Sequence, residues 1–183
     1  MQTPDISFKR HRFPPEIVAH AVWLYLRFNL SLREVEEILL ERGIDVSYET
    51  VRRWIANFGP QIASNLRRPQ ARPGDVWYLD EVVVKCAGTK FWLWRVVDQH
   101  GTVLEEVLQK RRDKRAENNH LPFRKRERTM QGHRSPGALQ RFVAMHSATR
   151  NCFSVPSRRR AAQTIRYHRL EAFDAWKTAA CIA

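Results

Sequence analysis

The chain has 183 residues, and its 32 Lys and Arg against 19 Asp and Glu give a formal net charge of +13. The length suits one compact domain with a small appendage and excludes a large multidomain enzyme. No apolar run reaches the roughly 20 residues that span a bilayer, and the N-terminus lacks the apolar core of a signal peptide. The three cysteines are odd in number, lie far apart and form no Cys-x-x-Cys pair, so neither a disulfide framework nor a zinc knuckle is indicated. This composition indicates a soluble, basic, cytoplasmic protein.

The excess positive charge lies in one part of the sequence. Residues 1–59 carry eight basic and eight acidic side chains, and residues 60–109 carry six of each. Residues 110–183 carry 18 basic and five acidic side chains, so they hold the whole excess of +13. Most of these basic residues are Arg, which binds phosphate groups in a bidentate manner. The distribution favours a polyanionic partner, most often nucleic acid, over a merely solvated surface.

The N-terminal third is expected to be helical. Residues 1–13 read as a flexible basic arm, and a helical apolar pattern opens at Pro15. Ser31 and Glu34 form a capping box at the start of a second helix. A third helical apolar pattern follows Ser47. Together these patterns predict a small all-α domain at residues 14–59.

The second and third helices are joined by a tight turn. Gly43 is placed to end the second helix, Ser47 to cap the third, and Gly59 and Pro60 to end it. This arrangement predicts a helix-turn-helix, whose second helix enters the major groove of DNA. The residues expected to face the DNA are Tyr48, Arg52, Arg53 and Asn57, and Arg and Asn are side chains that read guanine and adenine. A three-helix bundle without a role in DNA binding remains an alternative, and the zero net charge of this segment mildly favours it.

Residues 60–75, which contain Pro and Gly, are expected to form a linker. After it, the spacing of the apolar residues changes from the helical to the strand pattern. Segments 77–85, 91–97 and 102–108 are rich in β-branched and aromatic residues and are separated by short turns. They predict an antiparallel meander. The fold class is therefore α+β, with the second domain covering residues 76–183.

The C-terminal part returns to a helical pattern. A basic helical segment begins at Lys110 and is interrupted by Pro122. Ser135 and Pro136 are placed to start another helix, and a last helix is expected over residues 160–179.

Asp80 stands in the middle of the most apolar strand. Aspartate is disfavoured there, and its phase places it with Val76, Tyr78, Val82 and Val84 on a face that is expected to be buried. A buried carboxylate needs a hydrogen-bonding partner or a cation. A functional site and a satisfied structural aspartate are both open interpretations.

Glu117 is nearly alone among basic residues. In a helix it would share a face with His120, Arg124 and Arg128. A simple ion pair is one interpretation. The other is a metal-binding carboxylate beside phosphate-binding arginines, since carboxylates on a strand and a helix can hold two Mg²⁺ ions about 4 Å apart.

Several motifs together resemble an insertion-sequence transposase of the IS-six family. They are Trp77–Glu81 with Val84-Lys85, Trp94–Asp98, Arg111–Asp113, Arg115–His120 with Pro122, and Arg126–Arg128. The resemblance extends from about Phe8 to Trp176.

The resemblance implies a ribonuclease-H-like fold with an Asp-Asp-Glu catalytic core. It implies that Asp80 is the first catalytic aspartate, that Glu117 is the catalytic glutamate, and that both bind Mg²⁺ or Mn²⁺. Arg124 matches the basic residue that usually follows that glutamate, and Arg126 and Arg128 are expected to contact DNA. The implied partners are double-stranded DNA, namely the ends of the element and the target, and further copies of the chain.

The chain departs from the family in one respect. The family places a second catalytic Asp before the Glu, at the end of a fourth strand, but here Asp80 and Glu117 are only 117 − 80 = 37 residues apart. We interpret this as an internal deletion whose joint lies near Arg115 and Ala116. Mg²⁺ can bind through one or two carboxylates and substrate phosphates, so some metal binding is expected to survive, but efficient strand transfer is not.

Two functions follow from these expectations. One is a transposase that binds the element's ends and cleaves and joins DNA, with impaired catalysis in this copy. The other is a DNA-binding remnant that inhibits intact copies without catalysis. A DNA-binding regulator unrelated to transposition, against which the Asp80 and Glu117 motifs argue, and a decayed gene product are the remaining interpretations. Loss of the fourth strand would also leave the first strand as an apolar edge, which is expected to cause self-association.

Overall fold

The structure is a computed structural model that describes residues 6–67, 76–99, 101–110, 135–155 and 161–182. Three helices come first, followed by three strands and two further helices. Their bounds are α1 Pro15–Arg27, α2 Leu32–Glu41, α3 Tyr48–Arg67, β1 Trp77–Cys86, β2 Thr89–Asp98, β3 Val103–Gln109, α5 Pro136–Phe153 and α6 Ala162–Ala179. The expected α+β class and the three-stranded antiparallel meander are confirmed.

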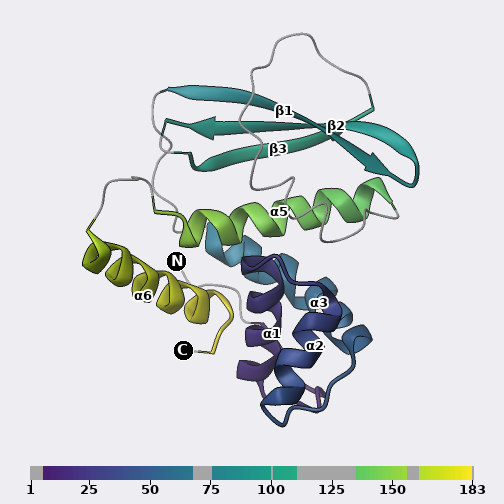
Figure 1. Ribbon diagram of the computed structural model, residues 1–183, viewed down its shortest axis with the longest axis vertical. Helices are drawn as coiled ribbons and strands as arrows, with labels where there is room; N and C mark the ends of the chain where they lie inside the picture. Colours follow the sequence, from purple (N-terminus) through teal and green to yellow (C-terminus); the bar gives the residue numbers. More distant parts are fainter. Residues whose placement is uncertain (1–5, 68–75, 100, 111–134, 156–160, 183) are drawn as a thin grey trace.

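Helix α5 is the central element of the fold. It lies along one face of the sheet, and the three N-terminal helices and α6 lie on its other side (Figure 1). Buried side chains from the sheet, from α5, from α6 and from the N-terminal helices form one hydrophobic core, which includes Val22, Leu93, Leu139 and Trp176. The division of the chain into two functional domains stays a prediction.

The capping signals of the N-terminal helices form as expected. The Ser31 side chain accepts from the Glu34 amide, and the Glu34 carboxylate accepts from the Ser31 amide. Gly43, at φ 75°, ends α2 with two bonds, from its own amide to Leu40 O and from the Ile44 amide to Leu39 O. This is the Schellman arrangement, which needs a residue that tolerates positive φ.

The predicted end of the third helix is wrong. Helix α3 continues through Gly59 and Pro60 to Arg67, so residues 60–67 are helical and not part of a linker. Pro60 removes one backbone donor, but Ile62 and Leu66 in the extension are buried and join the hydrophobic core. This burial offsets the local cost of the proline.

The arm also differs from its prediction, because residues 6–13 are folded onto α3. Ile6 is buried, the Phe8 ring stacks on Phe58 at 4.6 Å, and Phe13 meets Trp54 edge-on at 5.5 Å. The aromatic residues of the arm dock it, although its basic residues made it look like a solvated tail.

The two outer strands of the sheet differ in the contacts that their outer edges make. On β3, the Asn151 side chain bonds both the N–H and the C=O of Val103, and the Gln140 side chain bonds Leu108 N and Glu106 O. Eleven helical residues and five strand residues both span about 16 Å, so the two amides of α5 match the strand. Strand β1 pairs only with β2 in the described sheet and exposes Trp77 and Tyr78.

Candidate functional site

Asp80 lies on the sheet face that α5 covers. Its side chain is 1% exposed, and Val82 and Val84 on the same face are also buried. Val76 and Tyr78, which were expected on this buried face, are 50% and 55% exposed, so that part of the prediction is wrong. They stand at the start of β1, which pairs only with β2 in the described sheet.

Arg95 stands directly opposite Asp80 in the β1–β2 register, and Glu106 stands opposite Arg95 on β3. The Nε and Nη2 atoms of Arg95 lie 2.7 and 2.6 Å from Glu106 Oε1, and the two side chains are 1% and 3% exposed. Ser147 of α5 donates to the other carboxylate oxygen. Three charged side chains from three strands thus share one buried face.

Burial and neighbouring charges shift the pKa values of the ionisable groups in and beside this cluster. Burial raises the pKa of Glu106, while Arg95 and the Ser147 hydroxyl partly oppose that rise. Burial also lowers the pKa of Arg150, as does the positive charge of Arg95, whereas Glu106 raises it. We take the buried carboxylates and the two arginines as a compensated set, because uncompensated buried charges would be very costly.

The Asp80 carboxylate provides one ligand that a divalent cation could use. The other buried carboxylate on this face, Glu106, is bonded to Arg95, and no group of three or more Asp, Glu, His or Cys residues suited to a metal occurs among residues placed by the structure. Oxygen ligands suit Mg²⁺, but one carboxylate is an incomplete protein site. Further ligands would have to come from the remaining part of the chain or from substrate phosphates.

Several expected site residues lie outside the described residues. They are Glu117, Arg124, Arg126 and Arg128. Their roles stay predictions.

The expected DNA-facing residues of α3 do share an exposed surface. Tyr48 is 41% exposed, the Arg52 and Arg53 side chains are 55% and 74% exposed, and Asn57 is exposed as well. Glu49 lies 2.9 Å from Arg52 and 3.9 Å from Arg53, so it holds both guanidinium groups on one side of the helix. Such exposed pairs are weak, and a DNA phosphate can replace the carboxylate.

Sequence reasoning missed four residues that the structure brings to these surfaces. Arg33 of α2 lies over the Tyr48 ring at 5.5 Å, which adds a cation to the exposed face. Arg95, Glu106 and Ser147 form the buried cluster. Arg95 carried a usable signal, because it shares the phase of buried Leu93 and Val97 within an apolar strand.

Comparison with known proteins bears on this sheet directly. A family model described as a DDE domain matches residues 74–116, which include Asp80, Arg95 and Glu106. The chain is also similar to the transposase for the insertion-sequence-like element IS431mec of Staphylococcus aureus, with 34% identity over 106 residues. It is similar to the transposase for insertion sequence element IS257 in transposon Tn4003 of the same species, with 33% identity over 106 residues. These matches support the predicted similarity to the IS-six family of insertion-sequence transposases over the aligned residues.

This similarity covers only part of the chain and part of each relative. The aligned residues make up 58% of this chain and 47% of each relative, so the chain spans about half the length of the curated relatives that it matches. The DDE match ends one residue before Glu117. No solved structure matches the chain significantly.

Proposed function

We propose that the chain is a shortened transposase that binds DNA and has lost efficient cleavage and strand transfer. The observation that carries the loss of catalysis is the lack of a recognisable second catalytic aspartate between Asp80 and Glu117, which are only 37 residues apart. On the buried face of the described sheet, the other carboxylate, Glu106, is bonded to Arg95. Two-metal phosphoryl transfer needs several carboxylates around one point.

The proposed metal ligands are Asp80 and Glu117, with Mg²⁺ or Mn²⁺ as the cation. In such sites the cation supplies Lewis-acid activation of the phosphodiester and of the attacking oxygen. The 37 residues between these carboxylates leave no recognisable second aspartate of the family, and we attribute this to an internal deletion.

The proposed DNA contacts begin on α3. The exposed Arg52, Arg53 and Asn57 have the donor groups that read base edges in a major groove. The proposed partners are double-stranded DNA, namely the ends of the element and the target, and further copies of the chain. The proposed location is the cytoplasm, in association with the nucleoid. The structure contains no helix, in the part it describes, that is long and apolar enough to cross a membrane.

The alternative function is inhibition of intact transposases without catalysis. A chain that keeps its DNA-binding surface but lacks the second catalytic aspartate would occupy the ends of the element without cutting them. The same surface serves both proposals, so catalysis is the property that separates them.

A nicking and joining assay on labelled duplex DNA tests catalysis. The chain is incubated with Mg²⁺ or Mn²⁺, and Asp80→Asn is run beside it. For the impaired transposase we expect DNA binding with only trace product from the native chain and none from Asp80→Asn, whereas the inhibitor gives no product in either protein. Abundant product from the native chain that disappears in Asp80→Asn would overturn the proposed loss of efficient catalysis and would show that Asp80 works with a complete ligand set.

DNA recognition is tested by the double variant Arg52→Ala and Arg53→Ala. We expect it to lose its preference for the element's ends over unrelated duplex DNA. The matched control is Lys85→Ala with Lys90→Ala, which removes the same charge from the β1–β2 hairpin. Equal preference in the native chain and the arginine variant would contradict the assignment of α3 as the recognition helix.

A further inference from the structure

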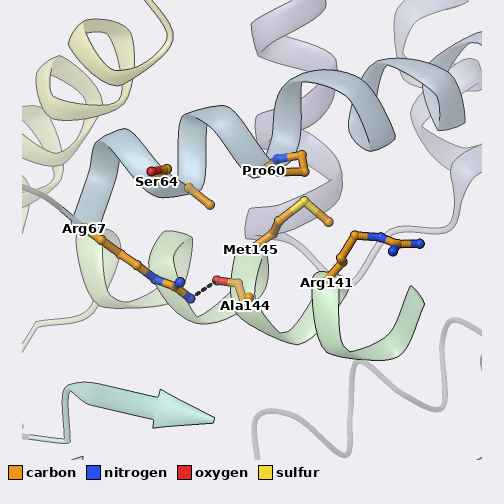
Figure 2. A pocket seen from close by; sticks show the side chains of 7 residues that line it. Pro60, Ser64, Arg67, Arg141, Ala144 and Met145 are labelled. Atoms are coloured by element: carbon orange, nitrogen blue, oxygen red, sulfur yellow. Dashed lines mark hydrogen bonds between the residues drawn. The ribbon is translucent and has the colours of Figure 1, made fainter. Parts of the chain in front are cut away.

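A groove lies between the C-terminal half of α3 and the N-terminal half of α5. It has a volume of about 430 Å³. Pro60, Ser64 and Arg67 line it from α3, and Arg141 and Met145 line it from α5, as Figure 2 shows. It shares no lining residue with the buried cluster around Asp80, although the charge of Arg67 lies close enough to Glu106 to oppose the rise in the pKa of that carboxyl.

The groove continues the exposed face of α3. Asn57, Pro60, Ser64 and Arg67 follow each other at intervals of three or four residues, so they form one stripe along the helix. The helix has 20 residues and is therefore about 30 Å long, and Arg67 lies about 21 Å beyond Arg53 along the axis. A straight helix of this length cannot keep its whole face within a curved major groove. Its C-terminal half is expected to meet the DNA backbone, as in homeodomains.

The groove carries positive charge at both ends. Figure 2 shows the Arg67 side chain reaching the Ala144 carbonyl at one end and Arg141 standing at the other. Arg67 Nη2 donates to Ala144 O at 2.6 Å, which fixes the side chain and leaves other guanidinium donors for a ligand. Arg141 is exposed, and its side chain makes no hydrogen bond or ion pair within the described ranges. None of the lining residues given by the structure is acidic.

We infer that this groove binds backbone phosphates of the duplex DNA whose bases face the N-terminal half of α3. Arg141 and Arg67 supply charge-assisted hydrogen bonds, and the Ser64 hydroxyl supplies a neutral donor. The fixed relation between α3 and α5 gives these contacts a positioning role, because they set the register of α3 on the duplex without reading sequence. The inference rests on the proposed DNA binding and adds α5 to the interface.

The test measures the affinity of the full chain for two labelled duplexes, one carrying an element end and one unrelated, over a range of salt concentrations. The variant is Arg141→Ala, and the matched control is Lys90→Ala, which removes one exposed charge from the β1–β2 hairpin. For Arg141→Ala we expect the slope of log affinity against log salt to flatten by about one. Affinity at 0.1 M salt should fall about five- to tenfold for both duplexes alike, so sequence preference should not change. Lys90→Ala should leave the slope unchanged.

Two outcomes would overturn this inference. One is an unchanged slope in Arg141→Ala, and the other is a flattening of equal size in Lys90→Ala. A native chain that binds neither duplex would instead overturn the proposed function itself, so the two failures are distinguishable. Arg67→Lys keeps the charge and serves as a second variant. Arg67→Lys should weaken binding to both duplexes, because lysine lacks the planar, bidentate donor geometry of the guanidinium group, but it should leave the slope of log affinity against log salt unchanged. Native affinity in Arg67→Lys would show that Arg67 does not belong to the site.

Discussion

Asp80 and Arg95 lie directly opposite each other on β1 and β2, and both side chains are 1% exposed. Arg95 also bonds Glu106 on β3, so the buried guanidinium occupies the middle position of a three-strand row of charges. Asp80, which we propose as a metal ligand, therefore lies within a buried cluster of charges. The cluster gives a direct prediction about stability.

Replacing Arg95 by Met should destabilise the fold by about 3–5 kcal/mol, because it leaves buried carboxylates without their cation. Adding Glu106→Gln to Arg95→Met should recover part of this loss, since the second change removes one of those charges. Urea unfolding followed by circular dichroism measures both effects. Lys90→Met, an exposed change on the same strand, is the control and should stay within about 0.5 kcal/mol of the native chain. A small effect of Arg95→Met would show that the cluster is not compensated in this way.

Gly59 marks a close contact between α3 and α5. A Cβ atom at Gly59 would lie 2.5 Å from Met145 Sδ, so Gly59→Leu should cost about 1–3 kcal/mol through overpacking. Thermal unfolding measures the change. Met145→Ala should be less destabilising in the Gly59→Leu protein than in the native protein, because it makes room for the new side chain. Ala56→Leu, on an exposed position of the same helix, is the control; an equal loss there would assign the effect to the helix and not to the contact.

Cys152 should react slowly with alkylating agents. Its thiol donates to Ala172 O at 3.5 Å, and burial raises its pKa to about 11 despite the opposing effect of Arg27. With that pKa, only about one thiol in a thousand is ionised at pH 8, and the thiolate is the reactive form. Raising the pH towards 11 should therefore accelerate alkylation about tenfold per unit. Mass spectrometry after timed iodoacetamide treatment measures this, with the urea-unfolded chain as the reference; equal rates in folded and unfolded protein at pH 8 would refute the prediction.

The open edge of β1 should cause self-association. The amide side chains of Gln140 and Asn151 satisfy backbone groups of β3, whereas β1 exposes Trp77 and Tyr78 beside an edge that has no strand partner in the described sheet. Exposed apolar edges pair with further copies of the same chain. Small-angle scattering over a concentration series should show oligomers of the native chain.

A matched pair of variants distinguishes association through the β1 edge from nonspecific association through other exposed apolar side chains. Trp77→Lys with Tyr78→Lys should shift the chain towards the monomer, because charge on an edge strand opposes pairing. Tyr167→Lys with Leu170→Lys changes two exposed side chains of α6 and should leave the oligomers in place. A monodisperse native monomer would rule out this mode of association.

Local signals in the sequence were sufficient for much of the fold. The Ser31 capping box, Gly43 and Ser135 mark helix ends through bonds to groups within a few residues, and those ends form where they were expected. The three strands could be predicted because their alternation and turns are also local properties. The family motifs around Asp80 likewise lie within one continuous stretch of sequence, which is why a single sequence could suggest the transposase relationship.

Only the tertiary structure decided the features that depend on contacts between distant segments. Gly59 and Pro60 look like a helix end, yet α3 continues because packing of its extension against α5 outweighs the local cost of the proline. The basic arm is docked because Phe8 and Phe13 meet rings on α3. Arg95 becomes the neighbour of Asp80 and the partner of Glu106 through strand register, and Arg67 and Arg141 come to one groove through the packing of two helices. Spacing along the chain does not encode these relations, because the energy that favours them arises only when the distant surfaces are buried together.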